Sequence, residues 1–393
     1  MLIVLKFGGS SVSTAEKIDN AAQIAAGYVE DGHSVVMVVS AKGDTTDDLL
    51  KQASEVSAEP SVRELDVLLT VGEQMSMSLM AMRLQEIGIP AISLCGWQAG
   101  VLTDEQHGNA RILEMHTYRV KHELDKGKVV IVAGFQGIST KGDLTTIGRG
   151  GSDTTAVALA ASLGADKCLI YTDVDGVYSA DPRTVPKAIK HNSVEYDEML
   201  EMASLGAGVL HNRSVELAKN TEIALKVLSS KNSDGGTEVN KRIMEGRRVT
   251  SVTCDKDTAL IEVKNATINI LPDILEILAI AGVTADMMTN IEKRLGITVP
   301  ESRSDKAIKA IEENRDRFGD ITVEADKSVA KVSAVGCGLG GDPMVAARML
   351  KALANEHISV RSIVAGEIKI SVLVSVIQAE NAVRSVHKEF FGI

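Results

Sequence analysis

The first 230 residues alternate short apolar segments with longer segments of helical patterning, and this alternation limits the fold more than any other feature. Runs typical of buried strands are LIVLKF (2–7), SVVMVVSA (34–41), PAISLC (90–95), VVIVAGF (129–135), KCLIYTD (167–173) and ALKVLSS (224–230). The intervening patterns predict helices at residues 13–32, 62–88, 108–126, 152–163 and 193–219. Such alternation predicts an α/β fold with a mostly parallel sheet covered on both faces, which binds ligands at the carboxyl ends of its strands.

The C-terminal part of the chain contains a repeated pattern. The segment ILEILAIAGVTADMM (274–288) resembles MLKALANEHISVRSI (349–363), and each predicts a helix that runs into a strand. In the first copy, a predicted strand at 259–263 precedes this segment, and a strand at 295–299 and a helix at 304–317 follow it. In the second copy, the corresponding strand is at 330–335, and the following strand and helix are at 368–374 and 379–390. The repeat therefore predicts two βαββαβ units of ferredoxin-like topology.

A linker is expected between these two patterns. The segment SKNSDGGTEVNKR (230–242) is polar, contains glycine and has no periodicity. We therefore expect a first domain at 1–232, a linker at 233–248, a first repeat at 249–328 and a second repeat at 329–393.

Composition excludes several classes of protein. The formal net charge is −11 and aromatic residues make up 3% of the chain, so nucleic-acid binding through basic or stacking surfaces is not expected. No stretch reaches 18 uninterrupted apolar residues, which argues against a membrane partner, and the apolar N-terminus is too short for a signal peptide. The four cysteines are far apart, which favours reduced, buried thiols over zinc or disulfides: Cys95, Cys168, Cys254 and Cys337. We expect a cytoplasmic protein.

The segment KFGGSS (6–11) follows the first strand and precedes a helix. Gly8 and Gly9 allow backbone N–H groups to approach an anion, and the helix dipole favours negative charge there. Lys6 closes the strand beside the turn and can reach a phosphate. The segment has neither the Walker pattern nor the Rossmann GxGxxG pattern, and a tight turn between strand and helix also explains it.

Two further segments place polar residues in apolar surroundings. VVSAKGDTTDDL (38–49) ends a strand, and the hydroxyls of Ser40 and Thr46 can orient a small polar ligand, although ordinary N-capping also accounts for this segment. LLTVGEQMS (68–76) places Glu73 in an otherwise apolar helix. An acid at this place is either a surface residue or the partner of an ammonium group, and the sequence favours neither.

The segment GRGGSDTTA (148–156) places three glycines, a cation and a carboxylate ahead of an alanine-rich helix. Arg149 presents a planar set of donors that suits a carboxylate or a phosphate. Asp153 is favoured at a helix start by the dipole, but it would repel an anion there. We therefore expect it to pair with a lysine, and Lys6 is the candidate. The alternative is a capped helix after a flexible loop.

The segment YTDVDGVYSADPR (171–183) again follows a strand and combines acids, tyrosines and an arginine around a glycine turn. These side chains suit the ribose and base rim of a nucleotide site. A calcium loop would need the spacing D-x-[DN]-x-[DN]-G and a later glutamate, but only Asp173-x-Asp175-Gly176 is present.

Taken together and in this order, these segments resemble the aspartate kinases of the amino acid kinase family. Further matching segments are HGNARI (107–112), IVAGFQG (131–137), TTIGRGGSDTTAVALAA (145–161) and RSVELA (213–218). The C-terminal repeats resemble the paired ACT domains of the same enzymes. The resemblance implies an amino acid kinase-like sandwich plus two ACT units, and ATP-dependent phosphorylation of the side-chain carboxylate of L-aspartate to 4-phospho-L-aspartate, the first step toward lysine, threonine and methionine.

The resemblance also implies roles for the motif residues. Lys6 would neutralise charge on the transferring phosphoryl group, and Asp153 would orient Lys6. In the substrate site, Glu73 would meet the ammonium group and Arg149 the α-carboxylate, with Thr46 and Gly150 beside them. The implied ATP-binding residues are Lys6, Gly8, Gly9, Ser10, Ser40, Thr172, Asp173, Tyr178, Asp181 and Arg183. Mg²⁺ would bridge the ATP phosphates without dedicated protein ligands.

One departure from the family pattern lies in SLGAGVLHNR (204–213). Gly208 stands where the family has a lysine close to the nucleotide, and Asn212 stands where it has a proline. Arg213 or His211 is a possible substitute for the missing cation. The departure keeps a second hypothesis open, a catalytically weak amino-acid sensor with a kinase fold. Acetylglutamate, glutamate 5-, UMP and carbamate kinases share the sheet, but the ACT repeats and GRGGSDTTA disfavour them.

The repeats also depart from feedback-inhibited relatives. The first repeat, VKNATINILPDIL (263–275), lacks their acid-Pro-Gly loop, and the second, GCGLGGDPMVAARM (336–349), has Asp342-Pro343 but Met344 in place of glycine. VAGEIKIS (364–371) keeps Glu367 but lacks the hydroxyl residues often found before it. We therefore expect feedback by lysine or threonine to be weak, altered or lost. The exposed sheet edges of the repeats predict a homodimer.

Overall fold

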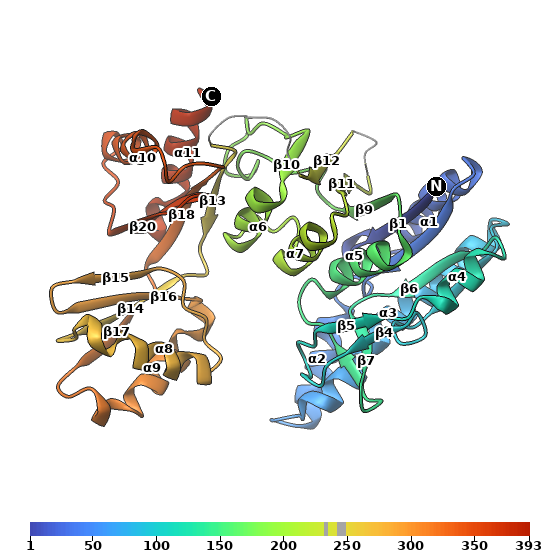
Figure 1. Ribbon diagram of the computed structural model, residues 1–393, viewed down its shortest axis with the longest axis horizontal. Coiled ribbons are helices and arrows are strands. Elements are labelled where there is room, and N and C mark those ends of the chain that lie inside the picture. Colours follow the sequence, from blue (N-terminus) through green and yellow to red (C-terminus); the bar gives the residue numbers. More distant parts are fainter. Residues whose placement is uncertain (232–234, 242–248) are drawn as a thin grey trace. The chain divides into compact units, whose positions relative to one another are not determined.

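The computed structural model describes residues 1–231, 235–241 and 249–393 (Figure 1). They form two compact units. The first comprises Met1–Val177, Lys190–Ser204 and Gly208–Met244, and the second comprises Tyr178–Ile189, Leu205–Ala207 and Glu245–Ile393. The expected boundary at residue 232 therefore needs correction, because two short segments that precede it pack with the C-terminal residues. Among the described helices, none is long and apolar enough to cross a membrane.

An eight-stranded sheet forms the centre of the first unit. Its order is β10-β12-β11-β9-β1-β2-β6-β3, and all neighbouring strands are parallel except β11 and β12. The strands are β1 (Leu2–Phe7), β2 (Ser34–Val39), β3 (Ala91–Leu94), β6 (Val129–Ala133), β9 (Lys167–Thr172), β10 (Ser193–Glu195), β11 (Leu225–Ser229) and β12 (Thr237–Asn240). The mostly parallel sheet is confirmed. However, β12 lies in the expected linker, because pairing with β11, and not local periodicity, defines this strand.

Helices cover both faces of this sheet, and the side chains of each strand point alternately to one face and to the other. Ile3, Leu5 and Phe7 of β1 pack in the core with α1 and α3. Because successive strand residues point to opposite faces, Lys6 points to the other face, where α5 packs against β1, β2 and β9. The helices of this unit are α1 (Ala15–Glu30), α2 (Thr45–Val56), α3 (Val62–Glu86), α4 (Tyr118–Leu124), α5 (Gly151–Leu163), α6 (Tyr196–Ser204) and α7 (Asn212–Thr221).

A second, four-stranded sheet in the first unit was not expected. Its order is β5-β4-β7-β8. The strands are β4 (Val101–Thr103), β5 (Ile112–Met115), β7 (Gln136–Ser139) and β8 (Leu144–Thr146). The predicted helix at 108–126 is therefore wrong for its first half, which forms β5, and only α4 is helical. The predicted helix at 193–219 is also divided into β10, α6 and α7, because Gly206 and Gly208 have left-handed backbones at φ +88° and +65°.

The second unit contains two four-stranded sheets, in the orders β15-β16-β14-β17 and β13-β18-β20-β19. The first sheet has β14 (Ala259–Lys264), β15 (Met288–Ile291), β16 (Arg294–Val299) and β17 (Thr322–Asp326), with helices α8 (Leu271–Ile280) and α9 (Ser304–Glu312). The second has β13 (Ser251–Asp255), β18 (Val329–Val335), β19 (Ser362–Ala365) and β20 (Lys369–Ser375), with α10 (Pro343–Asn355) and α11 (Ala379–Phe391). Two βαββαβ-like units are therefore confirmed.

The order of these units along the chain corrects the expected boundary between the repeats. Residues 249–328 were assigned to the first repeat, yet β13 at the start of that range pairs antiparallel with β18 of the second. The first βαββαβ unit is therefore inserted into the second. In this arrangement β13 forms the edge strand of the second βαββαβ unit, beside β18.

Candidate active site

The ion pair expected between Lys6 and Asp153 is present in the structure. Lys6 Nζ lies 2.5 Å from Asp153 Oδ1, and both residues are buried, with exposures of 8% each. Lys6 is the last but one residue of β1, and Asp153 lies in the first turn of α5. The pair therefore joins the carboxyl end of the central sheet to a helix N-terminus, which is where parallel α/β sheets bind anions.

The glycine turn after β1 lies directly beside this pair. A β-carbon built on Gly8 would lie 3.5 Å from Lys6 Nζ, so the backbone at Gly8 is adjacent to the ammonium group. A β-carbon on Gly9 would lie only 2.6 Å from the carbonyl oxygen of Ala41, so this turn needs glycine to pack against the turn after β2. The Gly43 N–H donates to the Gly9 carbonyl at 3.1 Å. The segment is thus both a tight turn and a neighbour of a buried cation.

Glu73 is a buried acid, so it is not the surface residue that the sequence left as one of two alternatives. It lies on α3 with an exposure of 3%, and its Oε1 accepts a hydrogen bond from the Ala41 N–H at 3.0 Å. Its Oε2 is buried without a hydrogen-bond partner among the described residues. Burial raises the pKa of this carboxyl from 4.5 to about 8. A buried carboxylate oxygen with no partner suits a cationic ligand group.

Arg149 lies in a loop of glycines and has no hydrogen bond or ion pair among the described residues, and its side chain is exposed. Gly148 and Gly150 on either side have φ values of +84° and +70°. A β-carbon on Gly150 would lie 2.2 Å from the side chain of His211, so the loop packs tightly against the start of α7. Gly150 caps α5 without a side-chain hydrogen bond, which leaves first-turn N–H groups available to a ligand.

Neither proposed substitute for the missing lysine is an available cation, so that suggestion is corrected. The Arg213 guanidinium donates to the Ile147 carbonyl at 2.5 Å, to the Ala110 carbonyl at 2.9 Å and to Asn109 Oδ1 at 3.0 Å. Desolvation by burial lowers the pKa of His211, which keeps its imidazole neutral near pH 7. Gly208 itself has a left-handed backbone that favours glycine over lysine.

The remaining predicted residues fall into two groups. Ser40 follows β2, and its N–H donates to the Phe7 carbonyl at 3.1 Å, while Thr46 lies in the first turn of α2. Ser10 is exposed in the turn after β1. At the end of β9, the Thr172 hydroxyl donates to Asp173 Oδ1 at 3.0 Å. All these residues belong to the first unit.

Three predicted nucleotide residues instead belong to the second unit: Tyr178, Asp181 and Arg183. Arg183 donates to both carboxylate oxygens of Asp181, from Nε at 3.0 Å to Oδ1 and from Nη2 at 2.8 Å to Oδ2. This hydrogen-bonded arginine lowers the pKa of the Asp181 carboxyl. The predicted nucleotide residues are therefore divided between the two units.

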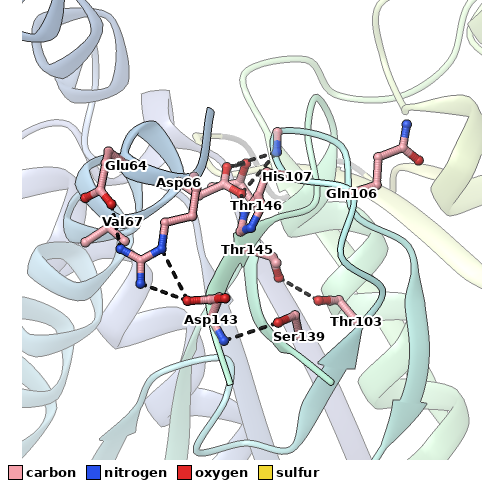
Figure 2. Close-up of polar contacts among 12 residues, drawn as sticks. Glu64, Asp66, Val67, Thr103, Gln106, His107, Ser139, Asp143, Thr145 and Thr146 are labelled. Carbon is pink, nitrogen blue, oxygen red and sulfur yellow. Dashed lines mark hydrogen bonds and ion pairs between the residues drawn. The ribbon is translucent and has the colours of Figure 1, made fainter. Parts of the chain in front are cut away.

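A buried polar network on α3 was not predicted from the sequence (Figure 2). Asp66 accepts hydrogen bonds from His107, the Gly108 N–H and the Thr146 hydroxyl. Asp66 precedes Glu73 by two helical turns, so both acids lie on the buried face of α3. The only signals in the sequence were an acid seven residues before Glu73 and the segment HGNARI, which has no pattern that identifies a bond to α3.

No disulfide joins the four cysteines, all of which lie among the described residues. Cys95 and Cys168 are buried as expected, whereas Cys254 and Cys337 are only partly buried. The expectation of four buried thiols is therefore correct for two of them.

Comparison with known proteins identifies the family of this chain. The family model of the amino acid kinase family matches residues 1–229, and an ACT domain model matches residues 332–390. Aspartokinase 2 of Bacillus subtilis is 45% identical over 397 residues, which cover 99% of this chain and 97% of that protein.

Two solved structures are similar over essentially the whole chain. E. coli aspartokinase III in complex with aspartate and ADP (R-state) has a TM-score of 0.86 at 25% identity and covers 100% of both chains. Aspartokinase III in complex with lysine and aspartate (T-state) has a TM-score of 0.79 at 25% identity and covers 99% of both. The family match over more than half of the chain and the full-length relative at 45% identity show that this chain belongs to the amino acid kinase family, and within it to the aspartokinases.

Proposed function

We propose that this protein transfers the γ-phosphoryl group of ATP to the side-chain carboxylate of L-aspartate and forms 4-phospho-L-aspartate. The observation that carries the proposal is the buried Lys6–Asp153 pair beside the Gly8–Gly9 turn, at the carboxyl end of the central sheet. The aspartate and ADP bound by E. coli aspartokinase III support both substrates. Because the Lys6 ammonium is buried and oriented by a carboxylate, it can stabilise charge that develops on a transferring phosphoryl group.

The α-ammonium and α-carboxylate groups of the acceptor amino acid are bound by different parts of the site. We assign its ammonium group to Glu73, whose Oε2 is buried without a partner among the described residues. We assign its α-carboxylate to Arg149 and the adjoining start of α5, with Gly150 allowing the close approach. The Thr46 hydroxyl at the start of α2 completes the substrate site. This division of charges selects an α-amino acid, because an ammonium and a carboxylate must both be present.

The donor nucleotide is bound through its phosphates by Lys6 and by the turn of Gly8, Gly9 and Ser10, with Ser40 on the neighbouring strand end. We assign the rest of the nucleotide to Thr172 and Asp173 after β9. No general base is required, because the acceptor carboxylate is already ionised near neutral pH. Catalysis then consists of alignment of the two anions and stabilisation of charge.

The residues of this site are compatible with Mg²⁺ that binds together with the ATP phosphates. Among the residues assigned to the reacting groups, the one carboxylate beside Lys6 is Asp153, and it is already neutralised by the lysine. These residues therefore suit a metal that is held mainly by the nucleotide and by water. When bound, Mg²⁺ would supply additional neutralisation of the phosphate charge.

A single assay tests the proposed reaction. With aspartate and Mg-ATP, hydroxylamine should trap the acyl phosphate as aspartyl hydroxamate in an amount that depends on both substrates. Glutamate and N-acetylglutamate in place of aspartate should give little product. Binding of aspartate without hydroxamate would reject the kinase and support the amino-acid sensor instead.

We also propose that inhibition by lysine or threonine is weak in this protein. In the second repeat, the Asp342 carboxylate accepts a hydrogen bond from the Met344 N–H at 3.0 Å and caps α10. Glu367 packs so closely against Gly340 that a β-carbon there would lie 2.7 Å from Oε2. E. coli aspartokinase III, by contrast, is known in a T-state complex with lysine and aspartate. Millimolar lysine plus threonine should reduce the initial rate of this protein by less than about twofold, and strong inhibition would contradict the proposal.

We further propose a cytoplasmic homodimer joined through the sheet edges of the second unit. The edge strand β15 carries the exposed side chains of Met288 and Ile291, and the edge strand β19 carries that of Ile363. Unpaired edge strands with apolar side chains are stabilised by pairing with another chain. Sedimentation at micromolar concentration should give a particle of twice the chain mass, and a monomer would exclude this association.

A further inference from the structure

Asp66 is a deeply buried carboxylate that the proposed chemistry does not use. Its exposure is 1%, and its hydrogen bonds reach three donors: two lie on the loop 104–111, and the third is Thr146 at the end of β8, where the loop 147–150 begins (Figure 2). Oδ2 is 2.7 Å from His107 Nδ1, Oδ1 accepts from the Thr146 hydroxyl at 2.5 Å, and the Gly108 N–H is 3.1 Å from both oxygens. A buried carboxylate is costly unless it is fully paired, and here the pairing connects α3 to both loops.

The two loops are also packed directly on each other. The Ala110 N–H donates to the Thr146 carbonyl at 2.9 Å. A β-carbon on Gly148 would lie 2.8 Å from Asn109 Oδ1 and 3.1 Å from the Gly108 carbonyl oxygen, so the backbone at Gly148 lies close to the loop 104–111. The Arg213 guanidinium binds the carbonyls of Ile147 and Ala110 and thus holds one residue of each loop. The segment from Thr146 to Gly148 is therefore fixed from three directions.

Arg149 follows this fixed segment immediately. It stands between two glycines with left-handed backbones, which by themselves place little restriction on its conformation. Its side chain has no partner among the described residues that would hold it. The backbone at Arg149 is therefore placed by the anchored residues on either side, and Asp66 is one of the anchors on the N-terminal side.

Asp66 and Glu73 are two turns apart on the same face of α3. One helix therefore carries the acid assigned to the substrate ammonium group and the acid that anchors the loop of the α-carboxylate ligand. We propose that Asp66, with His107 and Thr146, is a positioning unit that sets Arg149 relative to Glu73 and thereby determines affinity for the amino-acid substrate. This inference rests on the roles proposed above for Arg149 and Glu73.

The test uses matched substitutions on β8. Thr146→Val keeps the shape of the side chain but removes the hydroxyl that binds Asp66, and it should raise KM for aspartate about tenfold. KM for ATP should change less than about twofold, because the nucleotide is held by other residues. Thr146→Ser keeps the hydroxyl and should restore KM for aspartate. Asp66→Asn, which weakens all three bonds, should act in the same direction as Thr146→Val and more strongly.

Thr145→Val is the control for general damage. Thr145 is the neighbouring residue on β8, is fully buried, and forms its hydrogen bond with the Thr103 hydroxyl at 2.6 Å, away from Asp66. Its substitution should lower the thermal midpoint about as much as Thr146→Val and leave KM for aspartate unchanged. Equal increases of KM in both variants would show a nonspecific loss of structure and would overturn the proposal.

A double-mutant cycle separates this proposal from the assignment of Arg149. Arg149→Ala alone should raise KM for aspartate, and if it does not, the role of Arg149 fails regardless of Asp66. If it does, adding Thr146→Val to Arg149→Ala should have no further effect on KM, because the hydroxyl acts through the guanidinium. Independent, additive effects of the two substitutions would reject the positioning role and leave the assignment of Arg149 intact.

Discussion

Replacement of Lys6 by alanine should lower kcat by about a hundredfold or more, which corresponds to about 3 kcal/mol of lost transition-state stabilisation. The ammonium group is buried, paired with Asp153 at 2.5 Å and adjacent to the glycine turn, so water cannot replace its charge efficiently. KM for aspartate should change much less than kcat, since the amino acid is held by other residues. Steady-state kinetics by the hydroxamate assay would measure both constants.

Lys331→Ala is a suitable control for this experiment. Lys331 is similarly buried, with an exposure of 5%, and it forms ion pairs with Asp286 and Asp255, but it lies on β18 in the second unit. Lys6→Ala leaves the buried Asp153 without its cation, and Lys331→Ala removes the ammonium group from the partly exposed Asp255 and Asp286, so both substitutions should destabilise the fold. Only Lys6→Ala should reduce kcat per folded molecule. Near-normal turnover of the Lys6 variant would refute the assignment of the phosphoryl site.

Replacement of Glu73 by glutamine should raise KM for aspartate by about a hundredfold and should also remove a pH dependence. Burial raises the pKa of Glu73 to about 8, so the carboxyl is mostly protonated at pH 6.5 and becomes ionised as the pH approaches 8. The substrate ammonium binds the ionised form. Wild-type kcat/KM for aspartate should therefore rise about tenfold between pH 6.5 and 8, and the profile of the Glu73→Gln variant should be flat.

Glu73→Gln should weaken substrate binding but increase the stability of the folded protein at pH 8. Because the folded-state pKa lies above the ordinary value of 4.5, the folded protein holds an extra proton between these values. The free energy of unfolding therefore falls as the pH rises from about 4.5 to 8, and glutamine, which does not titrate, should abolish this loss. At pH 8 the variant should unfold at a higher temperature than the wild type. Lower stability together with a raised KM would indicate general damage and not the loss of an ammonium ligand.

The contact between two residues at the ends of regular elements was predicted from the sequence. The pairing of Lys6 with Asp153 could be inferred because one residue closes a strand and the other opens a helix, and parallel α/β sheets bring such ends together. The helices α1, α3 and α5 and the strands β1, β2, β6, β9 and β11 were predicted from periodicity that extends over enough residues to be recognised, whereas α2 was not predicted.

Residues whose roles depend on nonlocal packing were not predicted. The strands β4, β7 and β8 have three or four residues each, which is too few for a recognisable pattern. The strand β12 was assigned to a linker and β13 to the wrong repeat, because only their partners β11 and β18 identify them. Arg213 was considered as a replacement cation, whereas its guanidinium binds backbone carbonyls that are distant in the sequence.

The sequence by itself determined the class of the fold, the order of its motifs and the family to which the chain belongs, because strand and helix periodicity and glycine-rich turns are local properties. The tertiary structure alone decided that Glu73 is buried with a raised pKa, that Asp66 joins α3 to the loop before Arg149, and that one βαββαβ unit is inserted into the other. Burial, desolvation and strand pairing depend on residues that are far away in the chain, and a local sequence pattern does not identify those residues.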